Sequence, residues 1–194
     1  MAAETQRTAV YPGSFNPPTT AHLAIAEAVR AQRNVDRVVF MVSKKALAKE
    51  EVEHPRFQHR VAVLEAAAAA IEWLEIGVTD DQLLVDIARG FDVLVMGADK
   101  WHQINDVVWY DDDPAQRDAA IAALPTLAIA PRPPIAVPNE HLLAIHDDHA
   151  ATSSTRARAG ALELMLPSAA AFALETGAWI EPSRYDHWVA GRPA

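Results

Sequence analysis

Short apolar runs alternate with helical patterns along most of this chain, and this alternation restricts the fold more than any other feature. The strand-like runs are residues 8–11, 37–42, 73–78, 92–96, 126–130 and 142–145. Helical patterns at 21–32, 57–70 and 82–89 separate the first four runs. Apolar strands that alternate with helices form parallel βαβ units covered on both faces. The sequence therefore predicts an α/β fold, a doubly wound, Rossmann-like parallel sheet with helices on both faces.

The length of 194 residues is enough for one domain with its own core. We expect a single domain over residues 1–194 with a helical C-terminal part from about residue 153. Within that part, helices are predicted at 154–166 and 168–175, with Gly177 as a stop and a loosely ordered tail past Pro182. The proline-rich stretch from Pro131 to Pro138 is interpreted as a surface loop.

The amino-acid composition restricts the kinds of molecule that this protein can bind. A net charge of −9 disfavours nucleic acids and anionic membranes, because such contacts depend on Lys and Arg. The absence of cysteine excludes disulfides and thiolate chemistry. No apolar run reaches the ~18 to 20 residues of a membrane span, and the N-terminus has no signal-peptide pattern. We expect a cytoplasmic protein that binds small-molecule substrates, without nucleic acid or membrane as a partner; a homo-oligomer is compatible with the sequence.

The stretch Tyr11–Leu23 contains turn formers, hydroxyls and one histidine between a strand and a helix. Gly13 is expected to adopt a positive φ and to let a ligand approach the backbone. The helix then begins next to Thr19, and a helix N-terminus with free N–H groups favours anions. His22 would lie in its first turn and donate to phosphate oxygens. The simpler interpretation is a helix capped by Thr19 with a surface histidine.

A second stretch of similar chemistry lies far along the chain, from Thr152 to Arg158. Four hydroxyl side chains and two arginines lie there at the start of a predicted helix, which again indicates an anion site, now with full positive charge. A capped helix with solvated arginines is the simpler interpretation. Two such sites in one chain are more specific than either alone.

Together the two stretches resemble the adenylyltransferases of the nucleotidylyltransferase superfamily, which carry G-[ST]-F-[DN]-P, [HT]-x-G-H and I-S-S-T-x-x-R motifs. The resemblance covers roughly residues 8–177, and Ala21 departs from it where the family usually has glycine. It implies catalytic roles for four residues: Thr19, His22, Lys44 and Arg158. It also implies a set of ATP-binding residues: Gly13, Ser14, Phe15, Thr19, His22, Gly97, Asp99, Ser153, Ser154, Thr155 and Arg158.

The chemistry that the resemblance implies is AMP transfer from ATP without a covalent intermediate. The acceptor's phosphate attacks the α-phosphorus in line, while Mg²⁺, held mainly by the ATP phosphates, neutralises the departing pyrophosphate. No protein metal site is predicted. The His146–His149 segment is interpreted as a solvated loop, since adjacent residues of an extended segment point to opposite sides.

Two acceptors compete within this resemblance. The segments Ser43–Leu47 and Leu83–Ala88 resemble phosphopantetheine adenylyltransferase, but the two arginines that this subfamily has after its fourth strand are absent here. Gly97–Asp99 resembles nicotinate and nicotinamide mononucleotide adenylyltransferases, which also have a tryptophan near the place of Trp109 for stacking on the pyridine ring. The resemblance therefore favours a pyridine mononucleotide as the acceptor, with phosphopantetheine as the alternative. The implied acceptor-binding residues are Ser14, Phe15, Lys44, Lys45, Thr79 and Trp109.

The sequence allows an alternative class of protein, a candidate lid and two interpretations of Arg60. A non-catalytic nucleotide-binding module that kept the fold is the alternative of another class. Residues 101–114 are a candidate lid over the acceptor. Arg60 is interpreted as a structural or surface charge, with a phosphate contact as the alternative.

Overall fold

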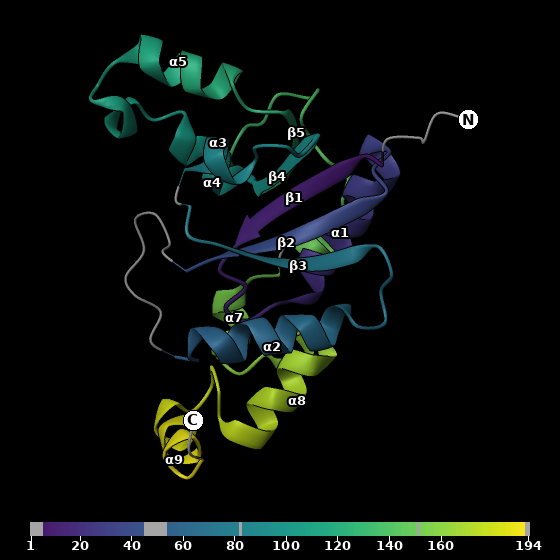
Figure 1. Ribbon diagram of the computed structural model, residues 1–194, viewed down its shortest axis with the longest axis vertical. Coiled ribbons are helices and arrows are strands. Elements are labelled where there is room, and N and C mark those ends of the chain that lie inside the picture. Colours follow the sequence, from purple (N-terminus) through teal and green to yellow (C-terminus); the bar gives the residue numbers. More distant parts are fainter. Residues whose placement is uncertain (1–5, 45–53, 82, 151, 193–194) are drawn as a thin grey trace.

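The computed structural model describes residues 6–44, 54–81, 83–150 and 152–192, and a parallel sheet forms its centre (Figure 1). The sheet has five strands in the order β3-β2-β1-β4-β5, all parallel. The predicted doubly wound α/β fold is therefore confirmed. The strands are β1 (Thr8–Gly13), β2 (Arg37–Ser43), β3 (Leu74–Thr79), β4 (Val93–Gly97) and β5 (Thr126–Ala130).

Helices cover both faces of this sheet, because alternate strand side chains pack in opposite directions. Tyr11 of β1 belongs to one core cluster with α1 (Thr20–Arg33) and α2 (Phe57–Ala68). The neighbouring Val10 belongs to a second cluster with α3 (Leu84–Ile87) and α4 (Ala98–Ile104). Both residues are buried, so β1 lies in the middle of the core.

The strand order reverses between β1 and β4. From β1 the chain adds β2 and β3 on one side, and it then places β4 and β5 on the other side. The carboxyl ends of β1 and β4 thus diverge into connections on opposite faces, which is where ligands bind in open α/β sheets. Gly13 and Gly97 are the last residues of these two strands.

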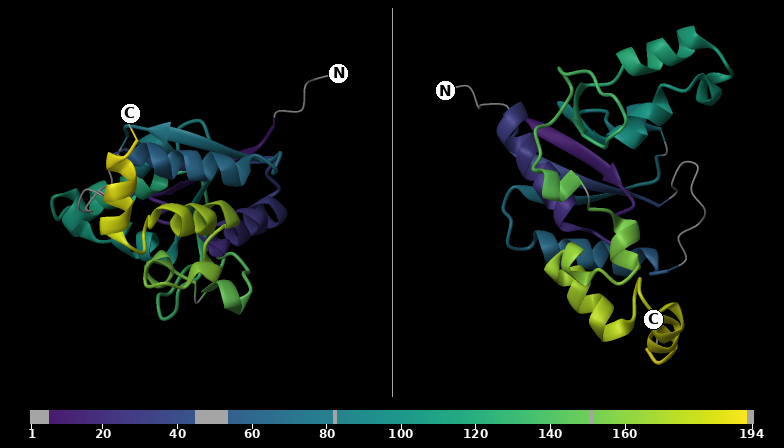
Figure 2. Two further views of the ribbon diagram at one scale, coloured as in Figure 1. Left: turned by 90° about the horizontal axis from the view of Figure 1, so that it is seen from below. Right: turned by 180° about the vertical axis from the view of Figure 1, so that it is seen from behind.

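The C-terminal part adds helices below the sheet as drawn in Figure 1. The view from behind in Figure 2 shows α7 next to the carboxyl end of β1, with α8 and α9 at the opposite end of the molecule from α5. The additional elements are η1 (Val107–Tyr110), α5 (Pro114–Ala122), α6 (Asp147–Ala150), α7 (Ser154–Arg158), η2 (Leu162–Leu164), α8 (Pro167–Thr176) and α9 (Pro182–Ala190).

Three predictions of secondary structure from the sequence were wrong in their extent. Residues 142–145 form only a single bridge, Ile129 to Leu142, because the Gln32 side chain hydrogen-bonds both the N–H and the C=O of Ala144. The helix predicted at 154–166 ends at Arg158, before Gly160 at φ 107°. The helix predicted at 82–89 is reduced to α3, and Gly90 at φ 87° follows it.

The tail past Pro182 was expected to be loosely ordered, and this expectation was wrong. Residues 182–190 form α9, and the Tyr185 side chain on it is 1% exposed. Its hydroxyl accepts a hydrogen bond from the backbone N–H of Arg56 (2.8 Å) and shares another with Nδ1 of His59 (2.6 Å). The aromatic ring thus docks α9 onto the start of α2.

Replacing Tyr185 with Phe tests this docking. The variant leaves the Arg56 N–H without its partner, so the free energy of unfolding should fall by about 1–3 kcal/mol, measured by urea denaturation. Ser183→Ala, an exposed position on the same helix, is the matched control and should change it by less than about 0.5 kcal/mol. Equal effects of the two substitutions would contradict the docking role of the hydroxyl.

Candidate active site

Two cavities open at the carboxyl ends of β1 and β4. The polar cavity has a volume of about 460 Å³ and the apolar cavity about 300 Å³. They have a common wall and therefore lie next to each other. The residues that line both are Pro12, Gly13, Ser14, Gly97, Lys100 and Gln103.

The loop of residues 14–18, between β1 and α1, is held by side chains and backbone from elsewhere in the chain. Arg60 donates to the carbonyl of Ser14 (3.0 Å), which confirms its structural interpretation. Four other donors complete the set. They are Arg158 to the Asn16 carbonyl, the Trp179 indole to Asn16 Oδ1 (2.5 Å), the Ser154 hydroxyl to the Pro17 carbonyl (2.9 Å) and the Leu166 N–H to the Pro18 carbonyl (3.1 Å).

Within this loop the positive φ belongs to Phe15 (43°), so its assignment to Gly13 was wrong. The buried Phe15 ring stacks on Phe40 at 4.7 Å between centroids. A Cβ on Gly13 would lie 3.0 Å from that ring. Gly13 is therefore required by the close approach of the Phe15 ring, while the ring's packing compensates for the left-handed backbone.

His22 occupies the third position of α1, where its ring nitrogens have different tasks. Nδ1 accepts the backbone N–H of Thr19 (2.9 Å) and lies 2.8 Å from the Thr19 hydroxyl. Because an N–H can only donate, Nδ1 carries no proton and the neutral ring has its proton on Nε2. Burial lowers the pKa of His22 to about 4. At neutral pH the side chain is thus an uncharged donor at the polar cavity.

The polar cavity is lined by every residue predicted to bind ATP. The set is Gly13, Ser14, Phe15, Thr19, His22, Gly97, Asp99, Ser153, Ser154, Thr155 and Arg158. Two of the hydroxyls also have structural roles, since Ser153 caps α7 by accepting from the Arg156 N–H (3.2 Å) and Ser154 holds Pro17. Because α7 has only five residues, the positive charge there comes from Arg158 more than from a helix dipole.

Sequence reasoning missed several residues of this cavity, above all Arg132 and Lys100. Arg132 follows β5 and pairs with Asp99. It had been included in a surface loop, although its place just beyond a strand's carboxyl end was a usable signal. The other lining residues with polar side chains outside the predicted ATP-binding set are Tyr11, Gln103, His149 and Thr152.

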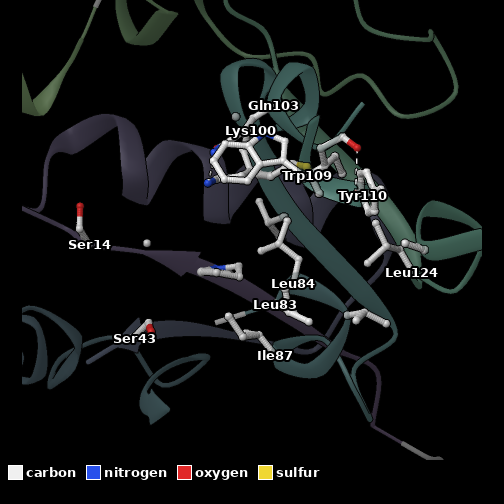
Figure 3. Close-up of a pocket in the computed structure, with 18 residues that line it drawn as sticks. Ser14, Ser43, Leu83, Leu84, Ile87, Lys100, Gln103, Trp109, Tyr110 and Leu124 are labelled. Atoms are coloured by element: carbon white, nitrogen blue, oxygen red, sulfur yellow. Dashed lines mark hydrogen bonds between the residues drawn. The ribbon is translucent and has the colours of Figure 1, made fainter. Parts of the chain in front are cut away.

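The apolar cavity lies on the other side of the common wall (Figure 3). Trp109, Lys100 and Gln103 are along one border and Leu83, Leu84 and Ile87 along the other. The Trp109 side chain belongs to η1 and is 44% exposed. The residues of α4 and η1 thus form a wall of this cavity, which is the region considered as a lid.

Two of the residues expected at the acceptor lie elsewhere. Neither Lys44 nor Thr79 lines either cavity. The Lys44 ammonium pairs with Asp80 (3.0 Å), and the Thr79 hydroxyl donates to Asp81 (3.0 Å). Lys45 falls outside the described residues. From the same strand end, Ser43 lines the apolar cavity instead.

The described residues contain neither a metal cluster nor a membrane-spanning helix. Across the described ranges, no group of three or more His, Asp or Glu side chains is placed to hold a metal ion. Residues 147–150 form the short helix α6 where a loop was expected. No helix of the described chain is both long enough and apolar enough to cross a membrane.

Comparisons with known proteins agree on one family. A family model described as cytidylyltransferase-like matches residues 10–160. A probable nicotinate-nucleotide adenylyltransferase of Streptococcus pyogenes is 33% identical over 50% of this chain and 55% of its own length. A phosphopantetheine adenylyltransferase of Campylobacter concisus is 32% identical over 47% of this chain and 56% of its own length. The chain thus spans about half the length of the curated relatives it matches.

The fold of this chain is also similar to that of solved structures. The nicotinic acid mononucleotide adenylyltransferase of Plasmodium falciparum, in a complex with APC, superposes with a TM-score of 0.61. The match covers 90% of this chain and 98% of that chain at 11% identity. At this identity the likeness shows the fold alone.

The buried, neutral state of His22 predicts a pH dependence of stability. In the unfolded chain the His22 side chain takes up a proton below its ordinary pKa of about 6.5. In the folded chain it does so only near its lowered pKa of about 4. Falling pH therefore favours unfolding. His22→Gln keeps an acceptor for the Thr19 N–H and removes the titration.

Urea denaturation of both proteins at pH 7 and pH 4.5 measures this effect. Between these pH values the wild type should lose on the order of 2 kcal/mol more stability than His22→Gln. A loss that is the same in both proteins would mean that His22 is not held neutral by the fold.

Proposed function

The chain belongs to the cytidylyltransferase-like family, and on this basis we propose that it transfers AMP from MgATP to the phosphate of nicotinate or nicotinamide mononucleotide. Pyrophosphate is the second product. The observation that carries the proposal is the pair of cavities that meet at Ser14, Gly97 and Lys100. Such an arrangement suits two substrates whose reacting phosphates must come together.

In this proposal the polar cavity takes ATP. Arg158 and Arg132 give it positive charge on two sides, and His22 presents an uncharged Nε2–H. A neutral donor can hydrogen-bond a phosphate oxygen at pH 7 without first acquiring a proton. Arginine adds the charge compensation that a triphosphate needs.

In this proposal the protein contributes to the reaction mainly by positioning the two substrates. An oxygen of the acceptor's phosphate attacks the α-phosphorus of ATP in line, and the bond between that phosphorus and the bridging oxygen to the β-phosphate breaks. The electron pair of this bond leaves with pyrophosphate. The side chains hold both phosphates in place and stabilise the charge that develops on the leaving group.

Mg²⁺ fits this site as a component of MgATP. Asp99 is the one carboxylate among the described residues that line the polar cavity, and it pairs with Arg132. The phosphate oxygens are therefore the proposed ligands of the metal. When bound, Mg²⁺ neutralises negative charge on the phosphates.

The apolar cavity takes the acceptor. Trp109 offers the face of an indole, which stacks favourably on a flat, electron-poor pyridine ring. Phosphopantetheine is the second candidate, because Leu83, Leu84 and Val85 also line this cavity and would contact an extended, weakly polar arm. Relatives named for each of the two activities support this pair of acceptors.

Pyrophosphate release from MgATP tests the proposal with a panel of nicotinate mononucleotide, nicotinamide mononucleotide and phosphopantetheine. We expect turnover with at least one mononucleotide, and His22→Ala should lower kcat about 100- to 1,000-fold through loss of one preorganised donor. His102→Ala, an exposed position on α4 that lines neither cavity, should retain wild-type turnover.

Turnover with phosphopantetheine alone would shift the assignment to the second acceptor. ATP binding in calorimetry without turnover for any acceptor would replace the enzyme with a nucleotide-binding module. An unchanged kcat in His22→Ala would remove His22 from the machinery.

A further inference from the structure

Charged side chains are divided very unequally between the two cavities. The polar cavity is lined by Arg132, Arg158 and Asp99 in addition to Lys100. In the apolar cavity Lys100 is the one charged side chain among the lining residues that the structure describes. Among the described residues of this cavity, Lys100 is therefore the source of positive charge for an acceptor's phosphate.

Lys100 lies where such a phosphate would have to be. It is the third residue of α4, which begins directly after the β4 terminus at Gly97. The half-buried side chain lines both cavities. Ser14 reaches the same wall from the end of β1. The ammonium is thus at the switch point of the sheet, between the two proposed substrates.

The side chain of Gln103 orients the Lys100 ammonium through a hydrogen bond. Its Oε1 accepts a hydrogen bond from Lys100 Nζ (2.6 Å), one turn further along α4, and Gln103 lines both cavities as well. Figure 3 shows the two side chains together beside Trp109. Because an ammonium has three donors, this hydrogen bond can orient Lys100 while it also contacts a ligand.

Electrostatics favour this location. A phosphate loses much of its hydration when it enters an apolar cavity, and this costs free energy unless a counter-charge meets it. No carboxylate lines the apolar cavity in the described part of the chain, so the described lining carries no negative charge that would repel the phosphate. Asp99, on the polar side, pairs with Arg132.

We propose that Lys100 binds the phosphate of the acceptor and holds its attacking oxygen toward the α-phosphorus of ATP. The inference rests on the proposed function, because it presumes a phosphate-bearing acceptor in the apolar cavity. It assigns to α4 the positive charge that sequence analysis placed on Lys44. The prediction is specific, since Lys100 should recognise the acceptor's phosphate and not its remaining body.

A thermodynamic cycle tests this specificity by removing the charge of Lys100 from the protein and the phosphate from the ligand. Nicotinamide mononucleotide and nicotinamide riboside, which lacks the phosphate, are titrated by calorimetry into wild type and Lys100→Met, each saturated with a non-hydrolysable ATP analogue. Met keeps most of the apolar stem of Lys. Phosphopantetheine and pantetheine form a second pair for the same measurement.

For the wild type we expect the phosphate to strengthen binding at least about 10-fold, and for Lys100→Met less than about 3-fold, as removal of a charge-assisted contact requires. Lys100→Arg should retain part of the increment. Arg89→Met removes an exposed cation that lines neither cavity and pairs with Asp86, and should leave the increment at its wild-type value.

The same phosphate increment in Lys100→Met and wild type would overturn the assignment, and so would a failure of both phosphorylated ligands to bind. The proposed function fails in a different way. A phosphate increment that depends on Lys100, together with no pyrophosphate release in the assay, would count against adenylyl transfer while the role of Lys100 stands.

Discussion

The hydrogen bonds that hold the loop between β1 and α1 are the interaction on which the rest of the site depends. Five donors from α2, α7 and the C-terminal part satisfy Ser14, Asn16, Pro17 and Pro18. Buried backbone carbonyls need such partners. The C-terminal segment is thereby tied to the end of β1, so Arg158 lines the same cavity as His22 although their numbers differ by 136.

Much of the fold could be predicted because its signals are local. Apolar strands separated by helices define the parallel sheet. Errors arose where tertiary contacts decide. Gln32 takes the backbone groups of Ala144, and the buried hydroxyl of Tyr185 orders a tail that sequence composition alone describes as loose.

The nucleotide side of the site was also accessible from sequence, because its two motifs carry their chemistry in contiguous residues. The acceptor side was harder. Lys44 stands just beyond a strand end as Lys100 does, yet a neighbouring carboxylate, Asp80, draws it away from the cavities. Arg132 and Lys100 reach the site through the order of the strands, which a linear sequence does not display.

In the proposed reaction, two substrates occupy the two cavities and their phosphates meet at the wall formed by Ser14, Gly97 and Lys100. A crystal structure with a non-hydrolysable ATP analogue and a mononucleotide acceptor tests it most directly. We expect the triphosphate near His22 and Arg158, the acceptor ring against Trp109 and the acceptor phosphate within hydrogen-bonding distance of Lys100. An acceptor bound in the polar cavity, or with its phosphate far from Lys100, would contradict it.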